Sequence, residues 1–289
     1  MASIRVRTHQ VHGLLIFVLL LWLGGCASPA GRFDDLARQG GLRREPLAGE
    51  RFDHVLYHRP GAGRTLHVYL SGDGTPWRTR HSPALDPTPR RPMVLSLMAL
   101  DPAPVLLLGR PCYHGAMRGC SVWDWTAGRY SPAVLESMAG ALERWLAAHP
   151  TGELALIGYS GGGSLAMLLA GHWEARRQRG ARLAPVTMLV TIAANLDIRR
   201  WAALHDYSPL ADSLNPAEQA PLPAHVAQWH LLGERDRNVP PALVEQALAA
   251  QSGARVLRFA GADHGCCWAP LWRAFLHRTI VSSATAIGP

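Results

Sequence analysis

The chain has 289 residues, of which 48% are hydrophobic, and its formal net charge at pH 7 is +8. A chain of this length suits one domain of ordinary α/β size with an ample core. Every basic residue is an arginine, and the arginines are scattered without a run of interleaved aromatic residues, so the positive charge does not indicate a nucleic-acid site.

The N-terminal residues have the pattern of an export signal. Arg5 and Arg7 supply positive charge, and an uninterrupted apolar run follows over residues 14–23. This run is short for a membrane span but suits the apolar core of a signal peptide. It ends in Leu-Gly-Gly-Cys at residues 23–26, which resembles the lipobox of bacterial lipoproteins.

The lipobox resemblance implies where the mature protein begins and where it resides. It makes residues 1–25 a lipoprotein signal peptide, Cys26 the lipidation site and residues 26–49 a lipidated tether. Ala27 follows the cysteine in place of an aspartate, which implies an outer-membrane lipoprotein of the bacterial cell envelope that faces the periplasm. A plain cleaved signal peptide with an incidental cysteine and an uncleaved N-terminal anchor are the alternatives.

Residues 50–289 are expected to form a single α/β domain. Short apolar runs alternate with helical runs, which is typical of a mostly parallel central sheet with helices on both faces. The expected strands lie around Val55 and over residues 65–70, 105–108, 154–157, 188–193, 230–233 and 255–259. The expected helices cover residues 93–100, 131–149, 161–179, 242–250 and 270–278. A proline-rich excursion over residues 76–92 and an irregular stretch over residues 195–223 interrupt the alternation.

Ser160 stands in a Gly-Tyr-Ser-Gly-Gly segment between an expected strand and an expected helix. This context gives the Gly-x-Ser-x-Gly pattern its chemical meaning, because a sharp strand-to-helix turn presents the serine hydroxyl at its tip. Gly158 and Gly162 have a steric role, since a side chain at either position would collide as the strand folds back into the helix. The segment therefore predicts a nucleophile elbow that carries Ser160.

A serine hydroxyl needs a base, and the base needs an orienting group. Asp236 lies in the loop after the strand expected over residues 230–233, and His264 lies in the loop after the strand expected over residues 255–259. The order serine, aspartate, histidine, each just beyond a strand, is that of an α/β-hydrolase triad. The chain thus resembles the α/β-hydrolase superfamily, and the resemblance covers roughly residues 50–280.

The resemblance implies a role for each of these residues. Ser160 would be the nucleophile, His264 the general base and acid, and Asp236 the acid that orients the histidine. Asp197, at the end of the preceding strand, is a rival for the third role. Asp236 is preferred because its Gly-x-x-Asp-x-x-Val-Pro surroundings match the usual family pattern. No cofactor and no metal are expected.

The same resemblance implies an oxyanion hole built from two backbone N–H groups. One donor should be Gly161, the residue after the nucleophile. The second should be Asp73, in the Ser-Gly-Asp-Gly loop after the strand over residues 65–70, where many relatives have His-Gly-x-Gly. Ser71 in place of the histidine departs from that pattern, and an ordinary glycine turn is the alternative.

Four cysteines remain besides Cys26, and they fit an oxidising compartment. Cys112 and Cys120 lie in one loop-like segment and are predicted to form a disulfide that closes a small loop. Cys266 and Cys267 are adjacent, and a vicinal disulfide, two free thiols and other pairings all stay open. A zinc site from these two cysteines and the neighbouring histidine is disfavoured, because no second Cys/His pair has suitable spacing.

Several loop residues bear on the substrate. Residues 195–223 are a candidate lid, and Arg110 is a candidate either for binding a substrate carboxylate or for an ion pair within the fold. Tryptophans in the expected loops at the C-terminal edge of the sheet make an aromatic-lined cleft plausible, with core packing as the alternative for each. These are Trp77, Trp123, Trp125, Trp201 and Trp268.

Three functions fit this sequence. The first is a membrane-anchored serine hydrolase, carboxylesterase-like, that cleaves ester or thioester bonds of a small or acyl substrate through an acyl-enzyme. The second is amide or peptide hydrolysis at the same site. The third is a catalytically silent lipoprotein that serves as a binding module. The expected partners are a small-molecule or acyl substrate and a membrane, with no nucleic acid, and the oligomeric state stays open.

Overall fold

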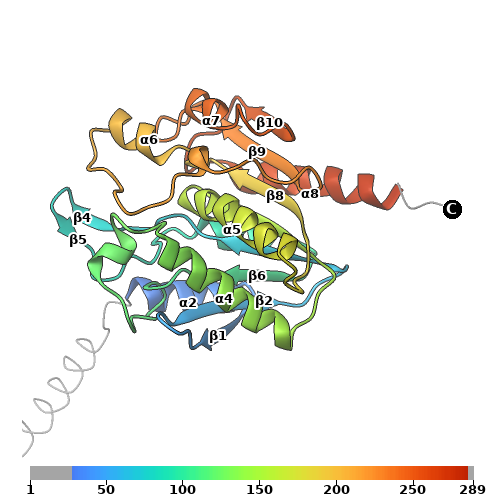
Figure 1. Ribbon diagram of the computed structural model, residues 1–289, viewed down its shortest axis with the longest axis horizontal. Coiled ribbons are helices and arrows are strands. Elements are labelled where there is room, and N and C mark those ends of the chain that lie inside the picture. Colours follow the sequence, from blue (N-terminus) through green and yellow to red (C-terminus); the bar gives the residue numbers. More distant parts are fainter. Residues whose placement is uncertain (1–27, 286–289) are drawn as a thin grey trace, which may run out of the picture.

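Residues 28–285 are described by a computed structural model and fold around one eight-stranded sheet (Figure 1). The strand order is β1-β2-β6-β3-β7-β8-β9-β10. The pairs β1–β2 and β2–β6 are antiparallel, and every other neighbouring pair is parallel, so the predicted fold class is confirmed. The strands are β1 (Arg43–Leu47), β2 (His54–Arg59), β3 (Thr65–Leu70), β6 (Val105–Leu108), β7 (Glu153–Tyr159), β8 (Val186–Ile192), β9 (Ala227–Gly233) and β10 (Ala254–Phe259).

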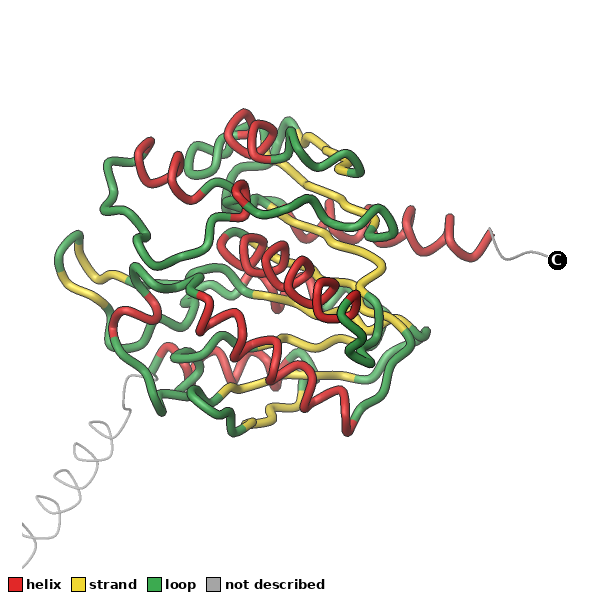
Figure 2. The backbone as a smooth tube through the Cα atoms, in the orientation of Figure 1, coloured by secondary structure: helices red, strands yellow, loops and turns green. Residues whose placement is uncertain are grey.

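Helices cover both faces of the sheet, and a buried hydrophobic cluster lies on each face (Figures 1 and 2). Side chains of β7 alternate between the two clusters, with Leu156 in one and Ile157 in the other. Burial on both faces explains why these strands read as continuous apolar runs. The first face carries α4 (Pro132–Ala148), α5 (Gly161–Gln178) and α7 (Pro241–Ala247), and the second carries α2 (Pro29–Gln39), α3 (Met93–Met98) and α8 (Trp268–Thr285).

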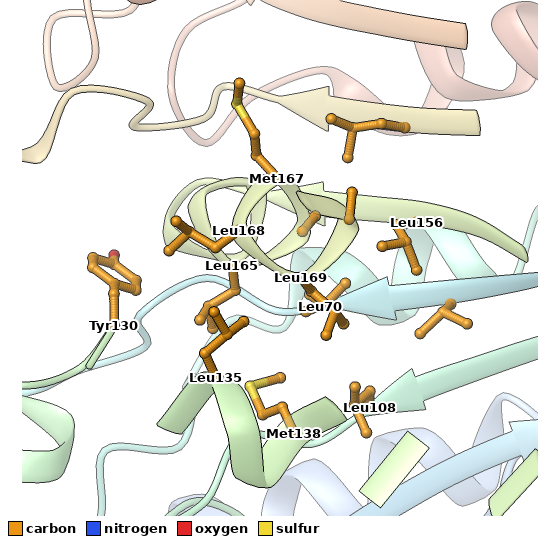
Figure 3. Packing of buried hydrophobic residues seen from close by; sticks show 14 of the residues in the cluster. Leu70, Leu108, Tyr130, Leu135, Met138, Leu156, Leu165, Met167, Leu168 and Leu169 are labelled. Carbon is orange, nitrogen blue, oxygen red and sulfur yellow. The ribbon is translucent and has the colours of Figure 1, made fainter. Parts of the chain in front are cut away.

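Helix α5 is packed deeply against the sheet, and all of residues 161–170 are buried. Figure 3 shows Leu165 and Leu169 of this helix among Leu70 of β3 and Leu135 of α4. Interiors packed in this way resist displacement, because a shift of the helix would open voids around several side chains at once. The N-terminus of α5 is therefore a fixed point of the fold.

The prediction of a tether over residues 26–49 is wrong for residues 28–49, which the structure describes. Helix α2 begins at Pro29, the Ser28 hydroxyl accepts the Gly31 N–H at 3.0 Å, and Phe33 is buried in the cluster on the second face. Strand β1 then pairs with β2 along its whole length. A serine cap, a proline in the first turn and an apolar stripe are sufficient reasons for a helix here, so the folded domain starts well before residue 50.

Other elements differ from the expectations in detail. The irregular stretch over residues 195–223 contains α6 (Ile198–Leu204) and the 3₁₀ helix η2 (Pro216–Glu218). The proline-rich excursion contains a small hairpin of β4 (Trp77–Thr79) and β5 (Ser82–Pro83), and the 3₁₀ helix η1 (Val122–Trp125) precedes α4. The expected signal peptide and Cys26 lie outside the described residues. No helix in the described part of the chain is both long enough and apolar enough to cross a bilayer.

Candidate active site

Ser160 lies at the sharp turn between β7 and α5. Its φ of 53° is in the left-handed region, which is uncommon for a residue with a side chain and is typical of this kind of turn. A Cβ at Gly158 would lie 2.2 Å from the carbonyl oxygen of Gly162, and a Cβ at Gly162 would lie 2.1 Å from that of Leu70. Both glycines are therefore needed for the close approach that the sequence pattern predicted.

The three residues of the expected triad meet at the C-terminal edge of the sheet. His264 Nε2 lies 3.0 Å from Ser160 Oγ, and His264 Nδ1 lies 2.8 Å from Asp236 Oδ2. The other oxygen of Asp236 accepts the N–H groups of Asn238 and Val239 at 2.9 and 2.8 Å. The Asp236 side chain is 1% exposed. Because a carboxylate can only accept, Nδ1 carries the proton and Nε2 turns its lone pair towards the serine hydroxyl.

The rival aspartate has a different role in the structure. Asp197 caps the N-terminus of α6, where its side chain accepts the Arg200 N–H at 3.1 Å. It also accepts a hydrogen bond from the Asn215 amide at 3.1 Å. Its carboxylate makes no hydrogen bond to His264, whereas that of Asp236 does. The structure thus brings Asp236, and not Asp197, to the histidine.

The loop after β3 places Asp73 beside the elbow. Among the described residues, no hydrogen-bond partner is found for the N–H of Asp73 or for that of Gly161, so both groups can donate to a ligand. A Cβ at Gly161 would lie 2.1 Å from Asp73 Oδ1, so the loop and the start of α5 are in close contact. The two residues expected to form an oxyanion hole are therefore neighbours.

The Asp73 carboxylate sits in a cluster that sequence reasoning did not find. Arg110 Nη1 donates to Oδ1 at 2.6 Å, Arg129 Nη1 donates to Oδ2 at 2.9 Å, and the Tyr130 hydroxyl lies 2.7 Å from both oxygens. Burial raises the pKa of Asp73, but the guanidinium groups of Arg129 and Arg110 outweigh it and lower that pKa to about 2. Arg110, 1% exposed, thus forms an ion pair within the fold, the second of its two expected roles.

The loop that carries His264 is held by neighbours from two other elements. The Tyr159 hydroxyl donates to the His264 carbonyl oxygen at 2.7 Å, and the Trp268 indole donates to that of Asp263 at 3.0 Å. Burial, with Asp236 and Asp263 nearby, raises the pKa of Tyr159 to about 12, so the hydroxyl stays a donor. No role is predicted for Tyr159 from the sequence, and its place directly before the nucleophile is the one local signal for it.

The four cysteines of the described part form two disulfides. Cys112 is bonded to Cys120, which is the predicted pairing. Cys266 is bonded to Cys267, which is one of the possibilities that the sequence left open. No group of three His, Cys, Asp or Glu side chains within residues 28–285 is arranged to hold a metal ion.

A cavity of about 850 Å³ opens beside Ser160 and His264. Trp77 and Trp201 line it, whereas Trp125 and Trp268 are buried in the fold. The candidate lid contributes residues 206–210, the proline-rich excursion contributes the β4–β5 hairpin and residues 89–92, and α3 contributes Met93 and Val94. In Figure 1 the hairpin and α6 both stand at the left, beyond the sheet. The contribution of the excursion depends on tertiary packing, and no local sequence signal marked it.

Several solved structures share this architecture at low sequence identity. The chain is similar to an esterase of Pyrococcus furiosus, with a TM-score of 0.57 and 12% identity, over 83% of this chain and 91% of the esterase. It is similar to a membrane phospholipase A described as a bacterial virulence factor, with a TM-score of 0.55 and 14% identity, over 97% and 99% of the two chains. It is also similar to an α/β serine hydrolase homologue from Coxiella burnetii, with a TM-score of 0.54 and 14% identity, over 82% and 96% of the two chains.

No protein-family model matches the chain, and no curated protein matches its sequence. At sequence identities this low, the similarity to these structures shows only that the fold is shared. The parallel strands from β6 to β10, the helices on both faces and the sharp turn after β7 agree with the architecture of those structures. The chain therefore has the α/β-hydrolase fold.

Proposed function

We propose that this chain is a serine hydrolase that cleaves ester or thioester bonds of a small or acyl substrate. One observation carries the proposal: Ser160, His264 and Asp236 form a continuous hydrogen-bonded series at the wall of a cavity. A buried carboxylate that fixes the tautomer of an imidazole, which in turn faces a hydroxyl, is the arrangement that turns serine into a nucleophile. Neither a binding module nor a packing role requires it.

In the proposed reaction, Ser160 Oγ attacks the carbonyl carbon of the substrate while its proton moves to His264 Nε2. The Asp236 carboxylate stabilises the imidazolium without taking the proton itself. The oxyanion accepts hydrogen bonds from the N–H groups of Asp73 and Gly161. The imidazolium then protonates the leaving alcohol or thiol, and an acyl-enzyme remains. His264 next deprotonates a water molecule, which hydrolyses the acyl-enzyme and restores the serine.

We also propose that the enzyme works at the bacterial cell envelope, anchored by lipid on Cys26 as an outer-membrane lipoprotein facing the periplasm. The lipobox-like sequence at residues 23–26 supports this location. The two disulfides of the described part support it as well, because disulfides persist in oxidising compartments.

Labelling with a fluorophosphonate tests the catalytic proposal. Wild-type protein should become labelled and should hydrolyse p-nitrophenyl butyrate, and Ser160→Ala should lose both properties. Ser208→Ala is the matched control, because Ser208 also lines the cavity but makes no hydrogen bond to Ser160, His264 or Asp236, and it should keep both. Labelling that persists in Ser160→Ala would show that another residue is the nucleophile.

The same assay separates the alternative functions. A binding module would show neither labelling nor turnover in the wild type. An amide hydrolase would cleave the p-nitroanilide of a given acyl group at a measurable rate, although the more reactive p-nitrophenyl ester would still be cleaved faster. The ester hydrolase proposed here should cleave the ester and give no detectable turnover of the anilide.

A further inference from the structure

Three arginines at the cavity have no assigned role. Arg80, Arg90 and Arg91 all line the cavity that contains Ser160, and all three are exposed. Arg80 lies in the turn of the β4–β5 hairpin, and the other two precede Pro92, the residue before α3. No ion pair or hydrogen bond joins their guanidinium groups to any residue within 28–285. They are therefore available to a ligand.

The charge of the remaining lining does not cancel these arginines. Arg129 also lines the cavity, and it shares the Asp73 carboxylate with Arg110, so that cluster is itself net positive. Asp206 supplies the other carboxylate of the lining. Positive charge thus exceeds negative charge around the cavity, and a concave surface with charge of one sign raises the local concentration of ligands with the opposite charge.

The rest of the lining is apolar and aromatic. Trp77 and Trp201 contribute to it, and so do Met93, Val94 and Leu210. A neutral ester can pack against these apolar side chains but has no charged group for the arginines to bind. An ester with an acyl chain and an anionic group engages both parts of the lining, because guanidinium groups match the geometry of carboxylate and phosphate.

We infer that the substrate is an anionic amphiphilic ester, whose carboxylate or phosphate is bound by Arg80, Arg90 and Arg91 while its ester bond lies at Ser160. This inference rests on the proposed hydrolase function. It adds a substrate class and three specificity-determining residues to that function.

Matched esters test the inference separately from the catalytic function. The substrates are hexanoylglycerol, the hexanoyl ester of glyceric acid and hexanoylglycerol phosphate, which carry the same acyl chain, and hexanoate release is measured for each. Wild-type protein should have a higher kcat/KM for at least one anionic ester than for hexanoylglycerol. The two anionic substrates distinguish a carboxylate from a phosphate. Turnover of hexanoylglycerol alone would uphold the hydrolase and overturn the anion site.

Variants assign any preference to the three arginines. The triple variant Arg80→Ala, Arg90→Ala and Arg91→Ala should lower the ratio of kcat/KM for the preferred anionic ester to that for hexanoylglycerol about tenfold, as three solvent-exposed ion pairs would. Arg78→Ala is the matched control, because Arg78 is exposed in the same hairpin but does not line the cavity, and it should leave the ratio unchanged.

An unchanged ratio in the triple variant would overturn the inference. If that variant also loses sedimentation on phosphatidylglycerol vesicles, the arginines belong to a membrane-binding surface instead of the substrate site.

Discussion

Asp73→Asn removes one negative charge from between two buried guanidinium groups and leaves the shape of the side chain almost unchanged. The pKa of Asp73 is about 2 against an ordinary 3.8, and one pKa unit corresponds to about 1.4 kcal/mol, so the folded state favours the charged form by about 2–3 kcal/mol. Removing one partner of a buried ion pair lowers the unfolding free energy by about 3–5 kcal/mol, because the remaining charge stays buried and unpaired. The Asp73 side chain is 20% exposed, which places the expected loss of unfolding free energy at about 2–4 kcal/mol.

The same change should also slow catalysis. The carboxylate holds the loop whose Asp73 N–H is the proposed oxyanion donor, and a lost oxyanion donor typically costs about 10²–10³ in kcat. We expect kcat on p-nitrophenyl butyrate to fall about a hundredfold with little change in KM, since the donor acts mainly on the transition state. Urea unfolding gives the stability of the variant, and the kinetics are measured where it is fully folded.

A surface ion pair provides the control. Glu245→Gln removes the carboxylate that Arg258 contacts at 2.6 Å on the surface, and it should cost less than about 1 kcal/mol and leave kcat unchanged. The reasoning is refuted if Asp73→Asn loses no more stability than Glu245→Gln and keeps its kcat. The pH dependence of the unfolding free energy provides an independent check. Because the folded-state pKa of Asp73 is lowered, the stabilisation from its carboxylate is complete above about pH 4 and is lost as the pH falls through about 2.

Two further predictions concern acid stability and the lipid anchor. Burial lowers the pKa of His114 to about 3, so below about pH 6.5 the unfolded chain binds a proton there that the folded chain does not, and stability falls as the pH is lowered from about 6.5 to 3. His114→Phe should reduce the slope of unfolding free energy against pH by about 1.4 kcal/mol per unit near pH 5, measured by urea unfolding, and equal slopes would contradict this. Radiolabelled palmitate fed to expressing bacteria should label the wild type and not Cys26→Ala, and a labelled variant would place the lipid elsewhere.

The local part of the site could be predicted from the sequence. The nucleophile elbow could be predicted from neighbouring residues, because the turn itself requires Gly158 and Gly162. Asp236 and His264 could be found because the C-terminal ends of parallel strands meet at one edge, so two loops far apart in sequence share one location. The alternation of apolar runs was enough to predict a sheet covered on both faces.

The non-local part could not be predicted. The partners of Asp73 lie 37, 56 and 57 residues away and come from segments with no pattern that links them to the loop after β3. Helix α2 is a different kind of miss, because Ser28, Pro29 and the spacing of Phe33 and Ala37 were a visible helix signal. A lipobox predicts a tether after its cysteine, whereas these residues favour a helix.

Helix α2 has a consequence for how the enzyme would meet its substrate. With lipid on Cys26, the three residues that lead to Pro29 reach at most about 10 Å. The folded domain would therefore lie close to the bilayer surface and could not move freely through the periplasm. The Ala30 N–H donates to Asp86 at 2.9 Å, and Asp86 belongs to the same excursion as the three arginines. The first turn of α2 is thus hydrogen-bonded to the segment that also carries cavity-lining residues. Such an enzyme would collect amphiphiles that travel sideways along the leaflet, and its catalytic rate would depend on their surface density.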